Sequence, residues 1–495
     1  MNSWVQAMAD GLFTPELLDT LRTDTQSPLP RVRQLYLNLY SAIERGLLPY
    51  DARLPSSRTL SAQLGLGRNA VISVYEQLAS EGLLSANGRR GTRVARHVKP
   101  PPSYSVTEWP RSLRISSNHS RLSSGGELAP GEPDAQLFPH DIWRKAQATA
   151  TRKAANRLGY RAQALIETRT SIARYLANYR SLQVDPEQIV VTSGTRQSLA
   201  LTANLFADPG DTAWVECPGY LGAVDAFRQS GLHVRPCGLD ADGLILPLAD
   251  VPLPRLIYLT PCFQYPMGMP LGAQRREALL DLARQNDSII FEDDYDSEFR
   301  DDSQPRPALA AESAGARVLH AGTFSKLLFP AIRVGWLVVP PEAVADAHQC
   351  LRVIGGGSNT IAQAVVAELL DNGSIARHLR HARQIYGQRR QALITALDGC
   401  ELFEPINQVS GSLSLVLRLS GQVPMKELVS ALDKAGIGAQ PLEHLDWQQP
   451  SLEQCKAIVI GLGNVDTMAI PATVARLTTA LTSLPCSPRA VVARS

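Results

Sequence analysis

The chain has 495 residues, 44% of them hydrophobic and 19% charged, and a net charge of +2. This composition excludes a wholly disordered chain, and the length predicts several domains. The seven cysteines form no CxxC pair, and the N-terminus lacks the basic start and apolar run of a signal peptide. We therefore expect a cytoplasmic protein without a metal site. No membrane contact is expected either, because no stretch has the roughly 18–20 apolar residues of a membrane helix.

Positive charge is concentrated near the N-terminus. Residues 28–97 contain ten arginines and only four acidic residues. A short extension, residues 1–27, precedes this basic unit, and residues 98–128, rich in Pro, Ser and Gly, follow it as a predicted linker. A basic unit joined to a mildly acidic remainder predicts a polyanion partner for that unit alone.

The basic unit has the pattern of a DNA-binding module. Helices are predicted over 31–45, 58–64 and 68–81, the last two separated by a short glycine turn, and a β-hairpin is predicted near 87–94. Such a turn places its second helix in the major groove of double-stranded DNA. A three-helix module with a solvated basic face is the alternative. The expected DNA contacts are Arg58, Arg68, Asn69, Arg89, Arg90 and Arg93.

The order of residues strengthens the DNA-binding interpretation. The string LPSSRTLSAQLGLGRNAVISVYEQLASEGLL strongly resembles the winged helix-turn-helix of the GntR superfamily. The resemblance implies an α+β winged helix-turn-helix domain that binds DNA.

Residues 129–485 form the predicted body of the protein. Short apolar runs alternate with helical patterns there, which predicts an α/β domain with a mostly parallel sheet. The predicted strands are 188–192, 212–216, 255–259, 288–292, 317–320 and 335–339. Helices follow over about 341–397, and strands near 412–418 and 456–461 predict a smaller α+β lobe. We place the large part at about 129–345 and the small lobe at about 346–485.

One lysine suggests amine chemistry in the body. Lys326 is the only lysine in residues 154–425, where arginine otherwise supplies the positive charge. A buried amine can form a Schiff base with an aldehyde, and the nearby Thr323, Ser325 and Arg333 suit a phosphate. Together these groups predict pyridoxal 5'-phosphate (PLP) as a cofactor. An ordinary surface lysine after a strand is the alternative.

Three further features support PLP. Asp293 ends an apolar strand, where a carboxylate can keep a pyridine nitrogen protonated. Residues 190–197 form a strand, a glycine turn and a helix start, whose backbone N–H groups attract phosphate. Tyr220 lies in a turn after a strand and could stack on a pyridine ring. Each feature alone also fits an ordinary loop or turn, but their combination favours the cofactor.

The strings FEDDYDSEF and GTFSKLLFPAIRVGW resemble fold-type I PLP-dependent enzymes of the aspartate aminotransferase superfamily. The resemblance implies that Lys326 forms the internal aldimine and that Asp293 pairs with the pyridine nitrogen. It also implies that Tyr295 hydrogen-bonds the phenolic oxygen and that Tyr220 stacks on the ring. The implied phosphate site consists of Gly194, Thr195, Arg196, Thr323, Ser325 and Arg333.

A GntR-type winged helix joined to an aminotransferase-like body resembles the MocR/GabR transcriptional regulators. The string LAPGEPDAQLFPHDIW at the start of the body fits that family as well. The resemblance implies a head-to-tail homodimer. Amino-acid-binding relatives carry a late arginine that holds the α-carboxylate, and our register places Val459 there, with Arg352 as a possible substitute. Phe263 also replaces a histidine that family members often carry near the ligand pocket.

These observations favour a PLP-dependent transcriptional regulator without physiological turnover. Its body would sense PLP itself or an amine without an α-carboxylate. Two alternatives remain open. One is an active aminotransferase with an accessory DNA-binding domain, and the other is a DNA-binding protein whose body has lost its cofactor.

Overall fold

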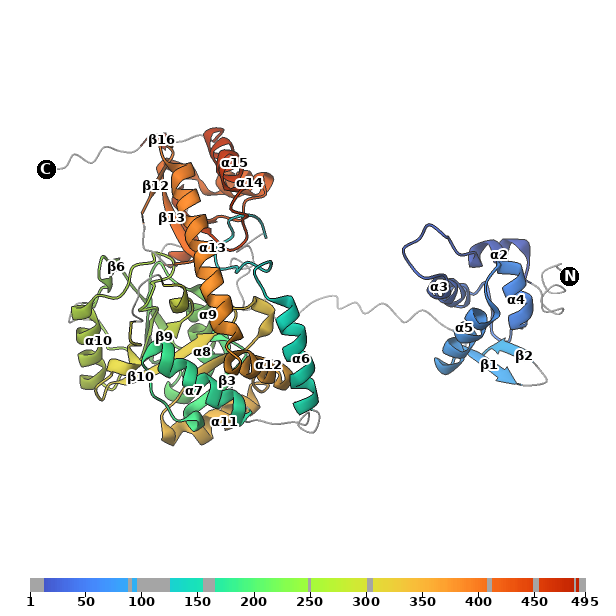
Figure 1. Ribbon diagram of the computed structural model, residues 1–495, viewed down its shortest axis with the longest axis horizontal. Helices are drawn as coiled ribbons and strands as arrows, with labels where there is room; N and C mark the ends of the chain where they lie inside the picture. The colour runs from blue at the N-terminus through green and yellow to red at the C-terminus, as the bar shows by residue number, and fades with distance from the viewer. Residues whose placement is uncertain are drawn as a thin grey trace. The chain divides into compact units, whose positions relative to one another are not determined.

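The computed structural model describes residues 13–87, 91–95, 125–154, 165–247, 251–300, 306–406, 412–447, 454–484 and 487–488. The chain divides into two compact units, Met1–Ile115 and Ser116–Ser495 (Figure 1). No helix within the described ranges is long and apolar enough to cross a membrane.

The first unit is a winged helix-turn-helix, as the sequence predicts. Its elements are α2 (Pro15–Leu21), α3 (Arg31–Glu44), α4 (Ser57–Leu64), α5 (Arg68–Ser80), β1 (Leu84–Asn87) and β2 (Gly91–Val94). Ser56 caps α4 by accepting the Thr59 N–H, and Gly65 ends α4 in the left-handed conformation. These local signals set the short turn before α5, and the antiparallel β1–β2 pair forms the wing.

The expected N-terminal extension takes part in this unit. Helix α2 lies within residues 1–27 and packs against α3 and α4. Leu17 and Leu21 of α2 belong to the same buried cluster as Leu35, Leu39 and Leu60. Burial of apolar area is the main stabilising term for so small a unit, so α2 enlarges its core.

The second unit is built on a seven-stranded sheet in the order β3-β11-β10-β9-β8-β4-β5. The strands are β3 (Ile189–Thr192), β4 (Thr212–Glu216), β5 (His233–Cys237), β8 (Leu256–Leu259), β9 (Ile289–Asp294), β10 (Arg317–Thr323) and β11 (Gly335–Val338). β5, β4, β8, β9 and β10 run parallel, whereas β11 is antiparallel to both neighbours. The mostly parallel sheet is confirmed, and its central strands are buried on both faces, which explains their continuous apolar runs.

Helices surround the sheet, and the last of them, α13 (Ser374–Leu397), extends toward the small lobe (Figure 1). The others are α6 (His140–Ala154), α7 (Ile166–Arg180), α8 (Thr195–Phe206), α9 (Leu221–Gln229), α10 (Ala273–Gln285), α11 (Val344–Val353) and α12 (Thr360–Asp371). α11 packs on α8, and α12 packs on α6 and α7, so both lie with the large part, although α12 and most of α11 fall within residues 346–485.

The small lobe has an antiparallel sheet in the order β12-β13-β15-β14, as the expected α+β lobe requires. Its strands are β12 (Phe403–Pro405), β13 (Ser414–Pro424), β14 (Gln440–Pro441) and β15 (Gln454–Gly461). Helices α14 (Met425–Ala435) and α15 (Ile470–Thr482) pack together, and α15 also contacts α13. Short strands complete the unit: β6 (Leu239–Asp240), β7 (Gly243–Leu244) and β16 (Ser487–Pro488).

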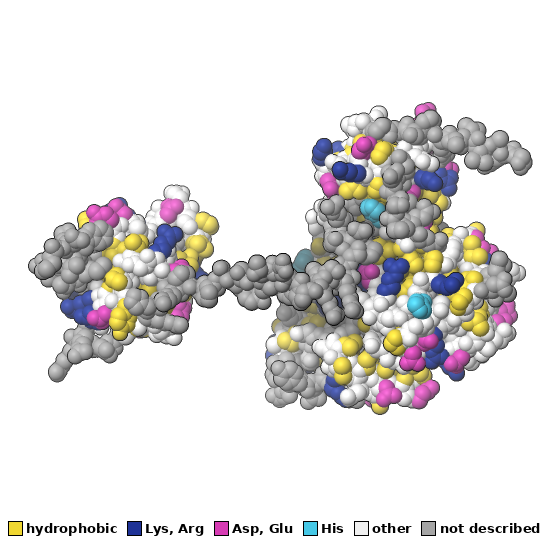
Figure 2. Space-filling view, turned by 180° about the vertical axis from the view of Figure 1, so that it is seen from behind, with side chains coloured by type: hydrophobic (Ala, Val, Ile, Leu, Met, Phe, Trp, Pro, Cys, Tyr) yellow, Lys and Arg dark blue, Asp and Glu magenta, His cyan; other side chains and the backbone are white. Residues whose placement is uncertain are grey.

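The surface of the larger unit carries both signs of charge. On the face seen in Figure 2, Lys and Arg side chains are interspersed with Asp and Glu side chains. Among the residues that the structure describes, this face therefore shows no large patch of a single sign of charge (Figure 2).

Candidate functional site

The first unit presents its predicted DNA contacts unevenly. Arg58 on α4 is exposed, as are Arg68 and Asn69 at the start of α5. Arg93 is half-buried. Its Nη1 donates to the Asp51 carbonyl at 2.7 Å and to Asp51 Oδ2 at 3.1 Å. Arg93 therefore ties the wing to the turn before α4. Arg89 and Arg90 lie outside the described residues.

The start of α5 remains open to an anion. Its N-cap is Gly67, which provides no side-chain hydrogen bond to the first helical N–H groups. Arg68 follows at once and donates weakly from Nε to Ser57 Oγ of α4, at 3.4 Å. A helix N-terminus with an exposed arginine beside it suits a DNA phosphate.

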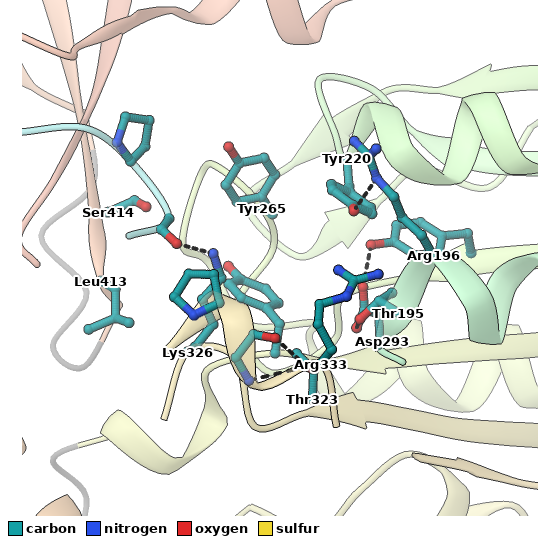
Figure 3. Close-up of a pocket in the computed structure, with 17 residues that line it drawn as sticks. Thr195, Arg196, Tyr220, Tyr265, Asp293, Thr323, Lys326, Arg333, Leu413 and Ser414 are labelled. Carbon is teal, nitrogen blue, oxygen red and sulfur yellow. Dashed lines mark hydrogen bonds between the residues drawn. The ribbon is translucent and has the colours of Figure 1, made fainter. Parts of the chain in front are cut away.

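In the second unit, one cavity of about 450 Å³ brings together all ten residues predicted for the cofactor. They are Gly194, Thr195, Arg196, Tyr220, Asp293, Tyr295, Thr323, Ser325, Lys326 and Arg333. The cavity lies where β3, β9 and β10 end and α8 begins (Figure 3). Binding at the carboxyl ends of parallel strands is usual for such sheets.

One end of the cavity is suited to an anion. Gly194, with φ +120°, is the N-cap of α8 and directs the helix start toward the cavity. Thr323 Oγ1 and Ser325 Oγ lie 2.9 Å apart, and the neighbouring Arg333 holds a left-handed φ of +51°. A non-glycine residue in this conformation is strained, and such strain concentrates at functional sites.

Lys326 supplies a buried amine directly after β10. Burial lowers its pKa, while the charges of Asp296, Asp293 and Glu132 act in the opposite direction. Its Nζ donates a hydrogen bond to the carbonyl oxygen of Gly131, shown as a dashed line from Lys326 in Figure 3. A lysine with a lowered pKa is more often in the nucleophilic, neutral form.

Asp293 supplies a buried carboxylate at the end of β9. It accepts hydrogen bonds from Tyr258 Oη at 2.8 Å and from Thr195 Oγ1 at 3.3 Å. The pKa of Asp293 is raised to about 7, mainly by burial and also by the charge of the neighbouring Asp294, whereas the hydrogen bonds from Tyr258 and Thr195 lower it. Asp293 is therefore balanced between its charged and neutral forms, and a cationic group beside it would favour the carboxylate.

A buried ion cluster lies directly behind Asp293. Arg180 Nε approaches Asp294 Oδ2 at 2.6 Å, and His320 Nε2 lies 3.3 Å from the same oxygen. Arg180 and His320 hold the pKa of Asp294 below its usual range, although burial alone would raise it. His320 is fixed by Trp336, whose Nε1 donates to His320 Nδ1 at 3.3 Å.

Tyrosines form the remaining wall of the cavity. Tyr220 Oη accepts from Arg196 Nε at 3.2 Å, which orients both side chains. The ring of Tyr265 stands nearly perpendicular to those of Tyr220 and Tyr295, at centroid distances of 6.5 and 6.0 Å. A Cβ at residue 222 would collide with the Tyr220 ring, so Gly222 is needed for this position.

Sequence reasoning missed seven further residues of the cavity. They are Pro130, Gly131, Tyr258, Tyr265, Pro330, Leu413 and Ser414. Tyr258 lies within the apolar run of β8, and its hydroxyl was the only feature in the sequence that could have indicated a polar role. Leu413 and Ser414 come from the small lobe, and no local pattern predicts which lobe residues meet Lys326.

Val459 and Arg352, the positions considered for a carboxylate-binding arginine, both lie away from the cavity lining. Val459 is fully buried in an apolar cluster with Leu221, Val416 and Leu445. Arg352 donates to Gln349 on its own helix. Phe263 does not line the cavity either.

Arg418 and Arg476 are the nearest arginines before and after Val459 in the sequence, and both form ion pairs away from the cavity lining. Arg418 pairs with Glu404 at 3.0 Å, and Arg476 pairs with Glu127. Among the lining residues, the cations are Arg196, Lys326 and Arg333.

Comparison with known proteins defines the class. Residues 31–94 match the family of bacterial regulatory proteins called gntR, and residues 127–450 match aminotransferase class I and II. The chain is thus a GntR-type winged helix-turn-helix joined to a fold-type I aminotransferase domain. Within that class, it belongs to the MocR family of GntR-type transcriptional regulators.

Two relatives illustrate a match that spans both units and about nine-tenths of the chain. The probable rhizopine catabolism regulatory protein MocR of Rhizobium meliloti is 31% identical over 459 residues, covering 90% of this chain and 92% of the relative. The HTH-type pyridoxine biosynthesis transcriptional regulator PdxR of Corynebacterium glutamicum is 32% identical, covering 88% and 92%.

Solved aminotransferases resemble the body. Kynurenine aminotransferase of Pyrococcus horikoshii, solved with PMP, is 26% identical with a TM-score of 0.66, covering 75% of this chain and 95% of that chain. LysN of Thermus thermophilus, solved with a phosphopyridoxyl-leucine adduct, is 26% identical with a TM-score of 0.67, covering 74% and 95%. The structural neighbours therefore bind cofactors of the PLP type.

Proposed function

We propose that the chain is a PLP-dependent transcriptional regulator, whose cavity binds PLP and whose ligand state controls DNA binding by the winged helix. The observation that carries this proposal is the meeting of three groups in one cavity: a buried amine, a buried carboxylate and an anion-binding end. PLP combines an aldehyde, a pyridine nitrogen and a phosphate, and these three groups correspond to that set.

The residues present fit the cofactor. Lys326 would hold the aldehyde carbon, and Asp293 would face the pyridine nitrogen, whose positive charge would keep Asp293 ionised. The start of α8, together with Thr323, Ser325 and Arg333, would hold the phosphate. Tyr220 and Tyr295 would confine the ring. When bound, PLP supplies an electrophilic carbon that reacts reversibly with amines.

The effector we propose is PLP itself or an amine without an α-carboxylate. Beyond Lys326, the cavity is lined by Pro130, Gly131, Tyr265, Leu413 and Ser414, which carry no charge. A carboxylate at this end would lose water without gaining a cation from the described lining residues. The name of the Corynebacterium relative, a regulator of pyridoxine biosynthesis, agrees with PLP as a signal.

We further propose that two copies bind one double-stranded DNA site as a head-to-tail homodimer in the cytoplasm. A dimer places two α5 helices at two half-sites, which raises specificity over that of one module. Sedimentation of the full chain with and without PLP measures the stoichiometry, and a strictly monomeric, DNA-binding protein would contradict this part.

The test is an absorbance spectrum of the purified full chain between roughly 300 and 500 nm, with Lys326→Ala as the comparison. We expect a visible band that borohydride removes and that the variant lacks. Common α-amino acids should leave the band unchanged. Absence of the band after addition of PLP would refute the cofactor assignment. Steady-state release of a keto acid would instead support the alternative of an active aminotransferase.

A further inference from the structure

A segment between the predicted linker and the body touches both the cavity and the small lobe. We call residues 125–134 the strap. Pro130 and Gly131 of the strap line the cavity. In the sequence, residues 116–124 lie between the first unit and the strap. The strap is thus the first described segment of the body that follows the DNA-binding unit.

Backbone hydrogen bonds hold the strap on the small lobe. Glu127 N donates to Gly436 O at 3.1 Å, Gly438 N donates to Glu127 O at 2.8 Å, and Gly461 N donates to Leu128 O at 2.7 Å. Leu128 is fully buried. The strap therefore adds to the lobe as a strand-like edge, although its sequence is that of a loop.

Close packing fixes the path of the strap. A Cβ at residue 438 would lie 2.7 Å from the Ala129 Cβ, and a Cβ at residue 461 or 463 would collide with strap carbonyl groups. Side chains also hold the strap to α15, because Glu127 accepts from Thr473 Oγ1 at 2.6 Å and pairs with Arg476. Gly438, Gly461 and Gly463 thus form a glycine-lined groove in the lobe, along which the strap backbone lies.

The strap contacts Lys326 at Gly131, three residues before Asp134, which pairs with the buried Arg389. Lys326 Nζ donates to Gly131 O, and Gly131 has a φ of +79°. A Cβ at residue 131 would lie 2.8 Å from Nζ. A free lysine has two N–H donors as the neutral amine and three as the ammonium. When the Lys326 amine forms a C=N bond to an aldehyde carbon, the aldehyde oxygen leaves as water, and the nitrogen keeps at most one proton. The amine then loses donors for Gly131.

We propose that the strap transmits the chemical state of Lys326 to the segment leading to the DNA-binding unit, through the juxtaposition of Lys326, Gly131 and the glycine-lined groove. This inference rests on the proposed function, because it requires PLP to react at Lys326. Glu127 is a positioning residue in this scheme. It holds the strap against α15, so that a change at Gly131 moves the strap as a unit rather than being lost in local motion.

The experiment compares the full chain with Glu127→Ala, without and with PLP. Three quantities are measured: the visible absorbance band, hydrogen exchange at the Gly438 and Gly461 amides, and affinity for a duplex selected from a random pool by the wild-type chain. In the wild type, PLP should speed exchange at both amides and change DNA affinity by about 5–150-fold, the usual range of coupling between sites. Glu127→Ala should keep the band but reduce the change in affinity to about twofold or less.

Two further variants make the test specific. Glu127→Gln keeps an acceptor for Thr473 Oγ1 and should restore part of the coupling. Glu404→Ala removes the exposed pair with Arg418 on the same lobe, away from the strap, and should behave as wild type.

The outcomes separate the two ideas. Absence of the band in the wild type refutes the proposed function and the strap link with it. A band with unchanged exchange at Gly438 and Gly461 overturns the strap link alone. A band with faster exchange, but with full coupling kept in Glu127→Ala, overturns it as well.

Discussion

The buried pair of Arg180 and Asp294 provides a strong test of how the body is stabilised. Arg180 Nε and Asp294 Oδ2 lie 2.6 Å apart, and their side chains are only 4% and 2% exposed. Arg180 Nη1 also donates to the Arg306 carbonyl oxygen at 2.8 Å. Arg180→Met keeps most of the volume but leaves the Asp294 charge without its main partner. Breaking a buried pair in this way costs about 3–5 kcal/mol.

The assay is urea unfolding of the full chain followed by tryptophan fluorescence, which reports on the body through buried Trp214 and Trp336. Arg174→Met is the matched control on the same helix, because its pair with Asp371 is largely exposed. An exposed pair contributes about 0–1 kcal/mol. The double variant Arg180→Met/Asp294→Asn should recover part of the loss, because the unpaired Asp294 charge is gone, although Glu292, 3.8 Å from Arg180 Nη2 in the wild type, still lacks this cation.

The pH dependence has a definite sign. The folded state lowers the pKa of Asp294 through Arg180 and His320. A lowered pKa stabilises the fold above the unfolded value of about 3.9, and this stabilisation is lost as the pH falls. The difference between wild type and Arg180→Met should therefore be full near pH 7 and narrow below about pH 4. Equal losses for Arg180→Met and Arg174→Met at pH 7 would refute the reasoning.

Three other predictions concern the two units separately. Tyr258→Phe removes the hydroxyl that donates to Asp293 at 2.8 Å, and the loss of this donor should raise the pKa of the Asp293 carboxyl further. PLP binding near pH 7 should then weaken by about 10–100-fold in a spectroscopic titration. An unchanged affinity would contradict the role of Asp293. Leu39→Ala opens a cavity in the buried core of the first unit and should destabilise that unit by about 2–5 kcal/mol. DNA binding in gel shifts should fall, while the visible PLP band of the second unit should stay. Loss of the band would show that the two units do not fold independently. If Arg68 contacts a base, Arg68→Ala should weaken binding to one preferred DNA sequence by about 1–3 kcal/mol; if it contacts phosphate, binding to all sequences should weaken alike. Arg22→Ala, at an exposed position after α2, is the control. An equal effect of both variants would show that α5 is not the recognition helix.

Local signals explain how far the first unit could be predicted. The Ser56 cap and the left-handed Gly65 determine where α4 begins and ends, and both act within one helical turn. The predicted helix over 58–64 accordingly differs from α4 by one residue at its start. The predicted helices over 31–45 and 68–81 likewise differ from α3 and α5 by one residue at their ends. In contrast, the packing of Leu17 and Leu21 into the core depends on residues distant in the chain. The pairing of Arg93 with Asp51 is also a long-range contact, so a predicted DNA contact proved to have a structural partner.

The sequence by itself determined the order of elements and the chemical identity of the pocket. Gly194 and Lys326 follow buried strands, Asp293 lies at the end of one, and the ends of parallel strands meet at one sheet edge. Only the tertiary structure decided which other groups complete the cavity. Gly131 and Ser414 come from the strap and the small lobe, and Arg180 reaches Asp294 from a helix more than 100 residues away in sequence. The physical reason is that strand and helix signals are local, whereas burial of charge and closure of a cavity depend on how separate elements pack.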